Sequence, residues 1–218
     1  MNMTKNPEIS IALPIHRMDR AEFFLQRCLD SILDQSFEDY EVVITDNSDD
    51  SSLLKIIQTY AMPVRYSLNP RKGMAQNTNE AIRASRGRLI KLIYMDDYLA
   101  HKDALWDVFE SFQGHWLISP ADNNHKPRYT EDIHLGNNKL GSPSALTILN
   151  QDPLLFDEEM TWLLDCDYYK RMHDRYGEPV ILKRVGVKMG IHDGQMSHIL
   201  TQGEKDLEQR YMINKYNV

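Results

Sequence analysis

Short apolar runs alternate with segments of helical spacing along the first 120 residues of the chain. In the helical segments, apolar residues recur three and four positions apart, which places them on one face of a helix. Strands that alternate with helices form a mostly parallel sheet with helices on its faces, so the pattern predicts an α/β fold. The predicted strands are residues 9–16, 40–46, 64–69 and 88–95, and the predicted helices between them are residues 19–35, 51–61 and 74–85.

The first predicted helix carries the clearest signals. Its apolar stripe consists of Leu25, Cys28, Leu29, Ile32 and Leu33. Asp19, followed three residues later by Glu22, predicts a capping box at the start of this helix. Because Cys28 lies in the stripe, we expect it to be a core residue.

The pattern changes near residue 120, after a predicted helix at 101–113 and a predicted strand at 115–119. Residues 121–140 are polar with little periodicity, and loops of this length in compact domains are commonly functional, so we expect this one to face a substrate. The remaining predicted elements are a strand at 144–149, a helix at 157–176, one strand or a strand pair at 179–189, and a helix at 195–216. The length favours one domain over residues 1–218.

Composition and charge narrow the function classes. The formal net charge of −7 and the pI near 5.6 argue against a nucleic-acid binder, which needs a basic stripe. The two cysteines, Cys28 and Cys166, have no metal-ligand spacing, which argues against a zinc site or disulfide scaffold and favours the cytoplasm. No apolar stretch is long enough to span a membrane, and the N-terminal residues lack the apolar region of a signal peptide; peripheral contact with a membrane surface stays open.

Polar side chains gather where the predicted strands end. In open α/β sheets, ligands bind at the carboxyl ends of the parallel strands, and four successive strands deliver polar groups to that edge. Taken alone, each of these residues is typical of an ordinary turn. Their joint placement at one edge of the sheet favours a binding site. These residues are Pro14 and His16 after the first strand, Asp46, Asn47 and Ser48 after the second, Asn69 after the third, and Asp96 and Asp97 after the fourth.

The adjacent carboxylates of Asp96 and Asp97 favour a metal site over a simple turn. Two neighbouring carboxylates repel each other, and a hard divalent cation with oxygen ligands relieves that repulsion. Such a cation also neutralises the charge that develops when a diphosphate departs. We therefore predict that Mn²⁺ or Mg²⁺ binds here.

Residues 9–52 and 69–99 resemble the nucleotide-sugar-binding half of family 2 glycosyltransferases, which have the GT-A fold. The resemblance implies that residues 1–120 bind a nucleotide sugar and that residues 121–218, with the C-terminal helix, bind the acceptor. It also implies a site for the nucleoside and the donor sugar. The residues that the resemblance assigns to this site are Pro14, His16, Asp46, Asn47, Asn69, Gly73 and Asn77, with Asp97 near the ribose.

The acidic motif of that family maps onto Tyr94–Asp97, with Tyr94 where many members have a first Asp. This departure puts the strength of metal binding in question, but not the location of the site. Asp96 is then the expected metal ligand and Asp97 its partner on the metal or the ribose, and the two roles are exchangeable. His192 resembles a late histidine that some members place near the metal, and imidazole is a competent ligand for manganese. A surface histidine without a role is the alternative.

The second half resembles the family most closely at residues 156–172. Inverting members carry an acidic residue at the start of a helix that faces the acceptor, and Asp165 matches it. A carboxylate within hydrogen-bond reach of an acceptor hydroxyl takes its proton as the new bond forms, so we predict Asp165 as the general base. The alternative is that Asp165 only solvates a helix face. Tyr168 and Tyr169 are either aromatic platforms for a sugar or packing residues.

The resemblance therefore implies a metal-dependent, inverting glycosyltransferase that uses a nucleotide sugar as co-substrate. The donor is expected to be a UDP-sugar, although TDP- and GDP-sugars fit the same motifs, and a retaining outcome stays open. The acceptor would be a hydroxyl of a glycan or of a lipid-linked saccharide. Two alternatives are a sugar-phosphate nucleotidyltransferase, which the absence of glycine after the first strand disfavours, and a non-catalytic sugar-nucleotide- or glycan-binding module, which Tyr94 keeps open. The oligomeric state is left open.

Overall fold

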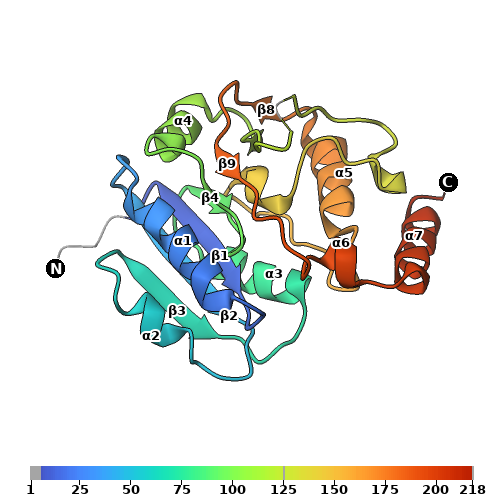
Figure 1. The fold of residues 1–218 in the computed structure, drawn as a ribbon. Helices are drawn as coiled ribbons and strands as arrows, with labels where there is room; N and C mark the ends of the chain where they lie inside the picture. Colours follow the sequence, from blue (N-terminus) through green and yellow to red (C-terminus); the bar gives the residue numbers. More distant parts are fainter. Residues whose placement is uncertain (1–5, 125, 218) are drawn as a thin grey trace.

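The computed structural model describes residues 6–124 and 126–217 and contains a seven-stranded sheet flanked by helices (Figure 1). The order across the sheet is β3-β2-β1-β4-β7-β6-β8, and the first four of these strands are parallel. β7 runs antiparallel to both of its neighbours. The strands are β1 Ile9–Ile15, β2 Tyr40–Asp46, β3 Val64–Leu68, β4 Leu89–Leu92, β6 Trp116–Ile118, β7 Leu146–Leu149 and β8 Val180–Ile181.

Helices cover both faces of this sheet. In β1, alternate residues from Ile9 to Ile15 pack with α1, α2 and α4, whereas Ala12 packs on the opposite face with α3 and α5. A strand buried on both faces reads as a nearly continuous apolar run, which is why the sequence predicted it well. The helices are α1 Ala21–Leu33, α2 Leu54–Ile57, α3 Met74–Ala84, α4 Ala104–Ser111, α5 Leu164–Tyr176, α6 Met196–Ile199 and α7 Gln202–Tyr216.

The parallel register brings the ends of the strands to one level. Ile15 of β1 lies opposite Asp46 of β2, and Ala12 of β1 lies opposite Leu92 of β4. The chain that leaves β4 therefore continues beside the chain that leaves β1. As a result, the acidic pair that follows β4 reaches the same edge of the sheet as His16.

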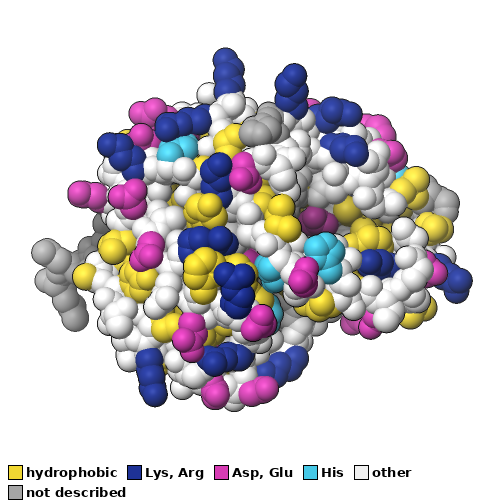
Figure 2. All heavy atoms as spheres, viewed as in Figure 1, with side chains coloured by type: hydrophobic (Ala, Val, Ile, Leu, Met, Phe, Trp, Pro, Cys, Tyr) yellow, Lys and Arg dark blue, Asp and Glu magenta, His cyan; other side chains and the backbone are white. Residues whose placement is uncertain are grey.

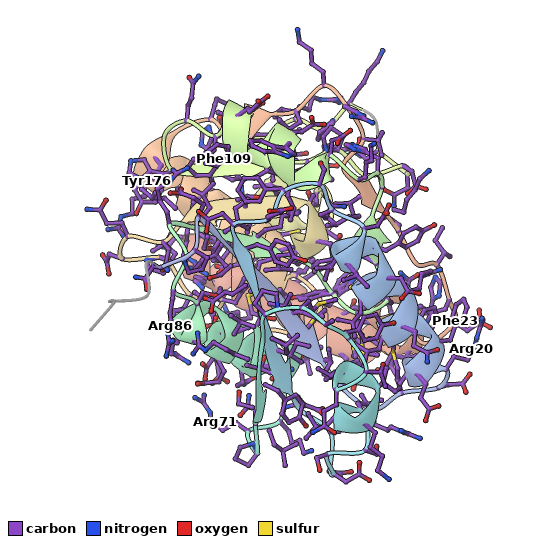
Figure 3. All side chains as sticks on the ribbon, turned by 90° about the vertical axis from the view of Figure 1, so that its left-hand side faces the viewer. Arg20, Phe23, Arg71, Arg86, Phe109 and Tyr176 are labelled. Atoms are coloured by element: carbon purple, nitrogen blue, oxygen red, sulfur yellow. The ribbon has the colours of Figure 1, made fainter. Side chains whose placement is uncertain are left out.

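The start of α1 differs from the prediction. The residue before the helix is Arg20, with a φ of 57°, and no side chain caps the helix there, so the capping box expected from Asp19 and Glu22 does not form. Glu22 instead lies 3.5 Å from Arg17. Figure 3 shows Arg20 and Phe23 together at this end of α1, with the guanidinium carbon 4.7 Å from the ring centre.

Three other elements are shorter than predicted or divided. The helix expected at 51–61 is reduced to α2, and the helix expected at 157–176 begins only at Leu164. The helix expected at 195–216 is divided into α6 and α7, because Thr201 and Glu204 form a capping box that starts a new helix. The segment 179–189 is a pair of strands in different sheets: β8 joins the large sheet, and β9 Val187–Lys188 pairs with β5 Tyr98–Leu99.

The distribution of charge on the surface and the apolar content of the helices are two general features of the structure. Figure 2 shows Lys and Arg side chains interspersed with Asp and Glu on one face. Within residues 6–124 and 126–217, no helix is long and apolar enough to cross a membrane.

Candidate functional site

A cavity of about 510 Å³ opens at the carboxyl ends of β1, β2 and β4. The start of α5 and the segment 189–197 form its other walls. The cavity therefore joins the two halves of the chain at the predicted edge of the sheet. The predicted site residues that line it are Pro14, His16, Asn47, Gly73, Asn77, Asp96, Asp97, Asp165 and His192.

Two predicted donor-binding residues, Asp46 and Asn69, do not line the cavity. Asp46 is fully buried, and its two carboxylate oxygens accept hydrogen bonds from the Ser48 N–H at 2.9 Å and the Tyr66 hydroxyl at 2.8 Å. The Asn69 side chain accepts from the Arg71 N–H at 3.0 Å. Both residues therefore shape the loops behind the cavity in this structure.

Asn77 holds the strand ends together beneath the cavity. Its side-chain nitrogen donates to the carbonyl of Ile15 at 3.0 Å and to the carbonyl of Thr45 at 2.9 Å. Its side-chain oxygen accepts from the Asn69 amide at 3.2 Å. These bonds tie the start of α3 to the ends of β1 and β2, so Asn77 fixes the relative positions of the strand ends at the cavity.

The loop that leads into α3 requires glycine. Gly73 has a φ of +126°, which other residues rarely adopt, and a Cβ there would meet the Gln76 side chain at 1.9 Å. Asn47 reaches this loop: its side chain donates to the Arg71 carbonyl, and its own carbonyl accepts from the Lys72 ammonium at 2.8 Å. The predicted glycine thus has a conformational reason for its place beside the cavity.

The two carboxylates of the acidic pair point to different partners. Asp96 Oδ2 lies 3.1 Å from His192 Nε2, and both residues line the cavity. Asp97 is only 2% exposed, and its Oδ1 accepts a hydrogen bond from the Gly190 N–H at 2.9 Å. Among the residues that the structure describes, no group of three His, Cys, Asp or Glu side chains is arranged to hold a metal. In this arrangement Asp96 and His192 face each other, whereas Asp97 is bonded to the backbone.

Asp96 and His192 still fit a divalent cation as part of a ligand set. Two ligand atoms at right angles around a cation, with bonds of about 2.1 Å, lie about 3 Å apart. In this structure the two side chains contact each other directly at 3.1 Å, so a cation could replace that contact with little movement of either atom. A carboxylate oxygen and an imidazole nitrogen are also a chemically suitable pair for manganese. The remaining ligands would have to come from the substrate or from water.

Asp97 lies within electrostatic reach of a buried lysine, Lys91, that the sequence analysis missed. Burial and the neighbouring Asp96 raise the pKa of Asp97 above its usual range, and Lys91 opposes that shift. Lys91 is itself buried in β4, where burial lowers its pKa, and its ammonium donates to the Ser144 carbonyl. The signal in the sequence was a lysine inside an otherwise apolar strand, which is rare without a partner.

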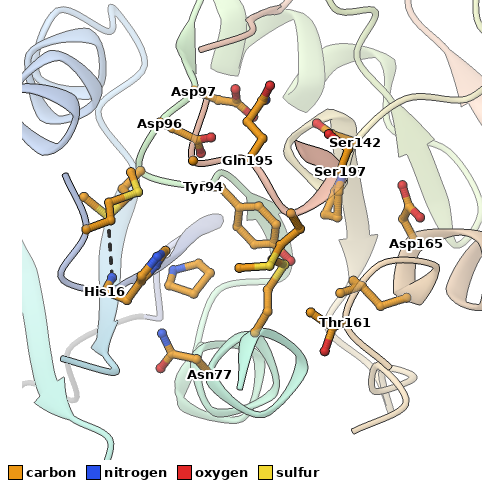
Figure 4. A pocket seen from close by; sticks show the side chains of 18 of the residues that line it. His16, Asn77, Tyr94, Asp96, Asp97, Ser142, Thr161, Asp165, Gln195 and Ser197 are labelled. Carbon is orange, nitrogen blue, oxygen red and sulfur yellow. Dashed lines mark hydrogen bonds between the residues drawn. The ribbon is translucent and has the colours of Figure 1, made fainter. Parts of the chain in front are cut away.

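Asp165 lies in the first turn of α5 and faces the cavity (Figure 4). Its Oδ1 accepts from the Cys166 N–H at 2.7 Å, and its Oδ2 accepts from the Asn138 side chain at 2.8 Å. Burial raises the pKa of Asp165 above its usual range, which moves it toward the range that suits a general base. Asn138 was missed because nothing in its local sequence links it to a residue 27 positions away.

Tyr94 lies between the acidic pair and Asp165, as Figure 4 shows. Its hydroxyl is 3.1 Å from the Thr78 hydroxyl, and its backbone N–H donates to the Ser144 hydroxyl at 2.9 Å. Burial raises the pKa of Tyr94, so the phenol is neutral at physiological pH. The neutral phenol of Tyr94 therefore occupies the position where many members of the resembled family have the first acidic residue of the motif.

Tyr168 and Tyr169 are packing residues and not sugar platforms. Both are 0% exposed. Their hydroxyls donate to the carbonyls of Leu154 at 3.1 Å and Ser142 at 3.0 Å. Their rings face the core beneath α5, so the platform interpretation was wrong.

The segment that faces the cavity is 189–197, and the expectation for residues 121–140 was wrong. Within the described part of 121–140, no residue lines the cavity, although Asn138 reaches Asp165 from there. Figure 2 shows His and acidic side chains gathered over the chain that joins β9 to α6. That chain lies so close to the acidic pair that a Cβ at Gly190 would meet the Asp96 carbonyl oxygen at 1.8 Å. The close approach explains why glycine stands there.

The sequence matches the family model of glycosyl transferase family 2 over residues 10–142. The putative colanic acid biosynthesis glycosyl transferase WcaA of Escherichia coli K12 is 27% identical, and the match covers 89% of this chain and 76% of that protein. Six further relatives match over 43 to 45% of this chain. In each of these six relatives, the matched region is only 10 to 29% of the length of the relative.

Two solved structures share the fold. S. aureus TarS in complex with UDP-GlcNAc superposes with a TM-score of 0.67 at 18% identity, covering 95% of this chain and 66% of that chain. The mannosyltransferase PcManGT of Pyrobaculum calidifontis, in complex with GDP-Man and Mn²⁺, gives a TM-score of 0.62 at 15% identity, covering 88% and 59%. At these identities the likeness concerns the fold, and it confirms the expected GT-A architecture.

The predicted enzyme class, a glycosyltransferase, agrees with the family match. Because that match includes more than half of the chain, the chain belongs to glycosyl transferase family 2.

Proposed function

We propose that this protein transfers a sugar from a nucleotide diphosphate donor, in the first place a UDP-sugar, to a hydroxyl of a glycan or lipid-linked saccharide. The observation that carries the proposal is that Asp165 and the Asp96–His192 pair line one cavity. Figure 4 shows Asp96 and Asp165 on opposite sides of Tyr94. One side offers ligands for a diphosphate-bound cation, and the other offers a base. Residues 1–120 would hold the donor and residues 121–218 the acceptor, within one domain.

The donor would lie along the strand ends. Pro14, His16 and Asn47 line the part of the cavity formed by β1 and β2, where we place the nucleoside. Asp46 and Asn69 would support it from behind, through the loops that they shape. The UDP-GlcNAc complex of TarS, which has the same fold, supports a UDP-sugar donor.

Asp96 and His192 would hold a divalent cation, and Asp97 would keep the neighbouring backbone in place through Gly190. Such a cation supplies Lewis-acid neutralisation of the leaving diphosphate. The Mn²⁺ in the complex of PcManGT supports manganese as a candidate.

The chemical step would be a single displacement with inversion. The acceptor oxygen forms a bond to the anomeric carbon while the bond from that carbon to the diphosphate oxygen breaks, and the nucleoside diphosphate leaves with the electron pair. Asp165 takes the proton of the acceptor hydroxyl. Each Asp165 oxygen already accepts one hydrogen bond, and a carboxylate oxygen has a second lone pair for the incoming proton.

Two further features bear on the setting. Both cysteines, Cys28 and Cys166, are buried and unbridged, which supports a reducing compartment, and we place the reaction in the cytoplasm. Tyr94 favours a second candidate, a sugar-nucleotide-binding module without transfer, because it replaces a carboxylate of the acidic motif with a neutral phenol.

Calorimetric titration of UDP, GDP and TDP, each with and without Mn²⁺, tests the proposal first. We expect Mn²⁺-dependent binding of UDP, and then release of UDP from a panel of UDP-glucose, UDP-galactose and UDP-GlcNAc. Binding without release from any donor, across a panel of glycan acceptors, would favour the binding module. The absence of binding by all three nucleotides would contradict both candidates.

A further inference from the structure

One carboxylate on α7 holds the backbone that forms the acceptor side of the cavity. Glu208 accepts hydrogen bonds from three successive N–H groups: Thr161 at 2.9 Å, Trp162 at 3.0 and 2.9 Å, and Leu163 at 2.9 Å. These residues precede α5 directly, and Leu163 is the residue before its first turn. The contact joins parts of the chain that are 45 to 47 positions apart.

The chemistry of this contact makes it strong and directional. Successive N–H groups that point to one side form a concave site for an anion, and a carboxylate fills it. Hydrogen bonds to an ionised acceptor are about twice as strong as neutral ones. Leu163 offers no side-chain cap to α5, so Glu208 supplies a negative charge near the positive end of that helix from a different helix.

The held segment forms part of the cavity wall. Thr161 and Trp162 line the cavity, and Asp165 follows two residues after Leu163. Since the backbone of 161–163 sets where α5 begins, its position also sets the direction of the Asp165 side chain. A shift of this segment would move the predicted base and two wall residues together.

The rest of α7 is docked by separate contacts. Asp157 accepts from the Tyr211 hydroxyl at 2.9 Å and from the Lys215 ammonium at 2.6 Å. The Tyr216 hydroxyl donates to Asp167 at 2.7 Å, and Met212 is fully buried. Because these contacts lie further along the helix, α7 retains attachment points when Glu208 is changed.

We propose that Glu208 is a positioning residue for transfer: through the backbone of 161–163 it fixes the acceptor wall and Asp165, and it does not act on the donor side. This inference rests on the proposed function. It assigns the C-terminal helix a role in turnover that its place in the sequence, far from the acidic motif, does not reveal.

The variants Glu208→Gln and Glu208→Ala test the inference, with Glu204→Gln as the matched control. Glu204 lies one turn earlier on α7 and contacts Thr201, and glutamine supports the same capping box. Three quantities are measured on the full chain: amide hydrogen exchange of peptides covering 158–166, the Kd for UDP with Mn²⁺, and the rate of UDP release from the UDP-sugar that the wild type uses best.

We expect faster exchange in 158–166, a Kd for UDP within about twofold of wild type, and a rate that falls about 10- to 100-fold in Glu208→Ala, as misplacement of a reacting group predicts. Glu208→Gln should lie between wild type and Glu208→Ala, because its amide oxygen still accepts a hydrogen bond, and Glu204→Gln should match wild type.

Several outcomes would overturn the inference. Unchanged exchange would show that Glu208 does not hold the segment, and faster exchange with an unchanged rate would show that the segment does not position the reaction. Equal losses of UDP binding and rate would indicate a general effect on folding. A wild-type chain that releases no UDP from any donor refutes the proposed function itself, which separates that failure from failure of the variant.

Discussion

The proposed donor side of the cavity is built on strand ends, whereas the proposed acceptor side depends on single side chains from distant parts of the chain. β1, β2 and β4 lie in parallel register, and Asn77 joins two of their ends through backbone carbonyls. On the acceptor side, Asp165 depends on Asn138, and the segment before it depends on Glu208. The comparison teaches that the edge of a sheet fixes the positions of several site residues together. The opposite wall rests on single contacts, so one substitution can move part of it.

Replacing the predicted base should have the largest effect. Asp165→Asn keeps the size of the side chain and one of its two hydrogen-bond acceptors but removes its basicity, so we expect UDP release to fall about 10²- to 10⁴-fold. The Kd for UDP, measured by calorimetry, should stay near that of wild type. Asp174→Asn on the exposed face of α5 is the control. Full turnover by Asp165→Asn would remove this residue from the chemistry.

On the donor side, Asp96→Ala should weaken UDP binding in the presence of Mn²⁺ by about 10- to 100-fold, because it removes one of the two protein ligands. Without Mn²⁺ the two proteins should bind UDP alike. Asp193→Ala, exposed in the same segment as His192, serves as the matched control. If Asp96→Ala retains the full Mn²⁺ effect, the cation does not bind at Asp96.

Asn77→Ala tests the rigidity of the strand ends. It removes one donor from each of two buried carbonyls, those of Ile15 and Thr45, and it removes the acceptor of the Asn69 amide, so the free energy of unfolding should fall by about 1–3 kcal/mol. Urea denaturation followed by circular dichroism measures it. Arg83→Ala, on the exposed side of α3, should change stability by less than about 0.5 kcal/mol. Equal stabilities of the two variants would contradict the joining role.

Asn138→Ala should have the smallest effect, and that effect should depend on pH. The Asn138 hydrogen bond favours the ionised form of Asp165 and so opposes the rise in pKa that burial causes. Without it, the pKa of Asp165 rises further, and the base is ionised only at higher pH. The acid limb of a pH–rate profile should therefore move to higher pH, with rates at alkaline pH near wild type.

Asn137→Ala, which loses only a contact to Asp132, is the control for this profile. A profile of Asn138→Ala that coincides with that of the control would show that the hydrogen bond does not tune Asp165.

Sequence reasoning located the edge of the sheet where the cavity lies, but it did not find the contacts that hold the opposite wall, for a physical reason. Strand ends in parallel register follow from local apolar patterns, so the places of His16 and Asp96 could be inferred before the structure was known. Asn138 and Glu208 act over 27 and 45 or more positions, and polar residues in loops and on helix surfaces give no periodic signal. The partner of Asp97 at Gly190 is 93 positions away and was hidden for the same reason, whereas Lys91 stood out as a lysine inside an apolar strand.

The predicted helix at 157–176 illustrates the limit. From Leu164 onward the apolar spacing predicted the helix correctly. The backbone N–H groups of Thr161, Trp162 and Leu163, however, donate to Glu208 and not to carbonyl oxygens of a helix. A tertiary partner thus decided where the helix begins. The division between α6 and α7 could have been predicted, since Thr201 and Glu204 have the spacing of a capping box.

The burial of the two cysteines has a practical consequence for watching the protein at work. Burial raises the pKa of both Cys28 and Cys166, so neither thiol reacts readily with alkylating reagents. Ile191, in the segment beside the acidic pair, is 75% exposed. The variant Ile191→Cys would therefore accept a single fluorescent label without removal of the native thiols, and its emission would report in real time whether the surroundings of that segment change when a nucleotide is added.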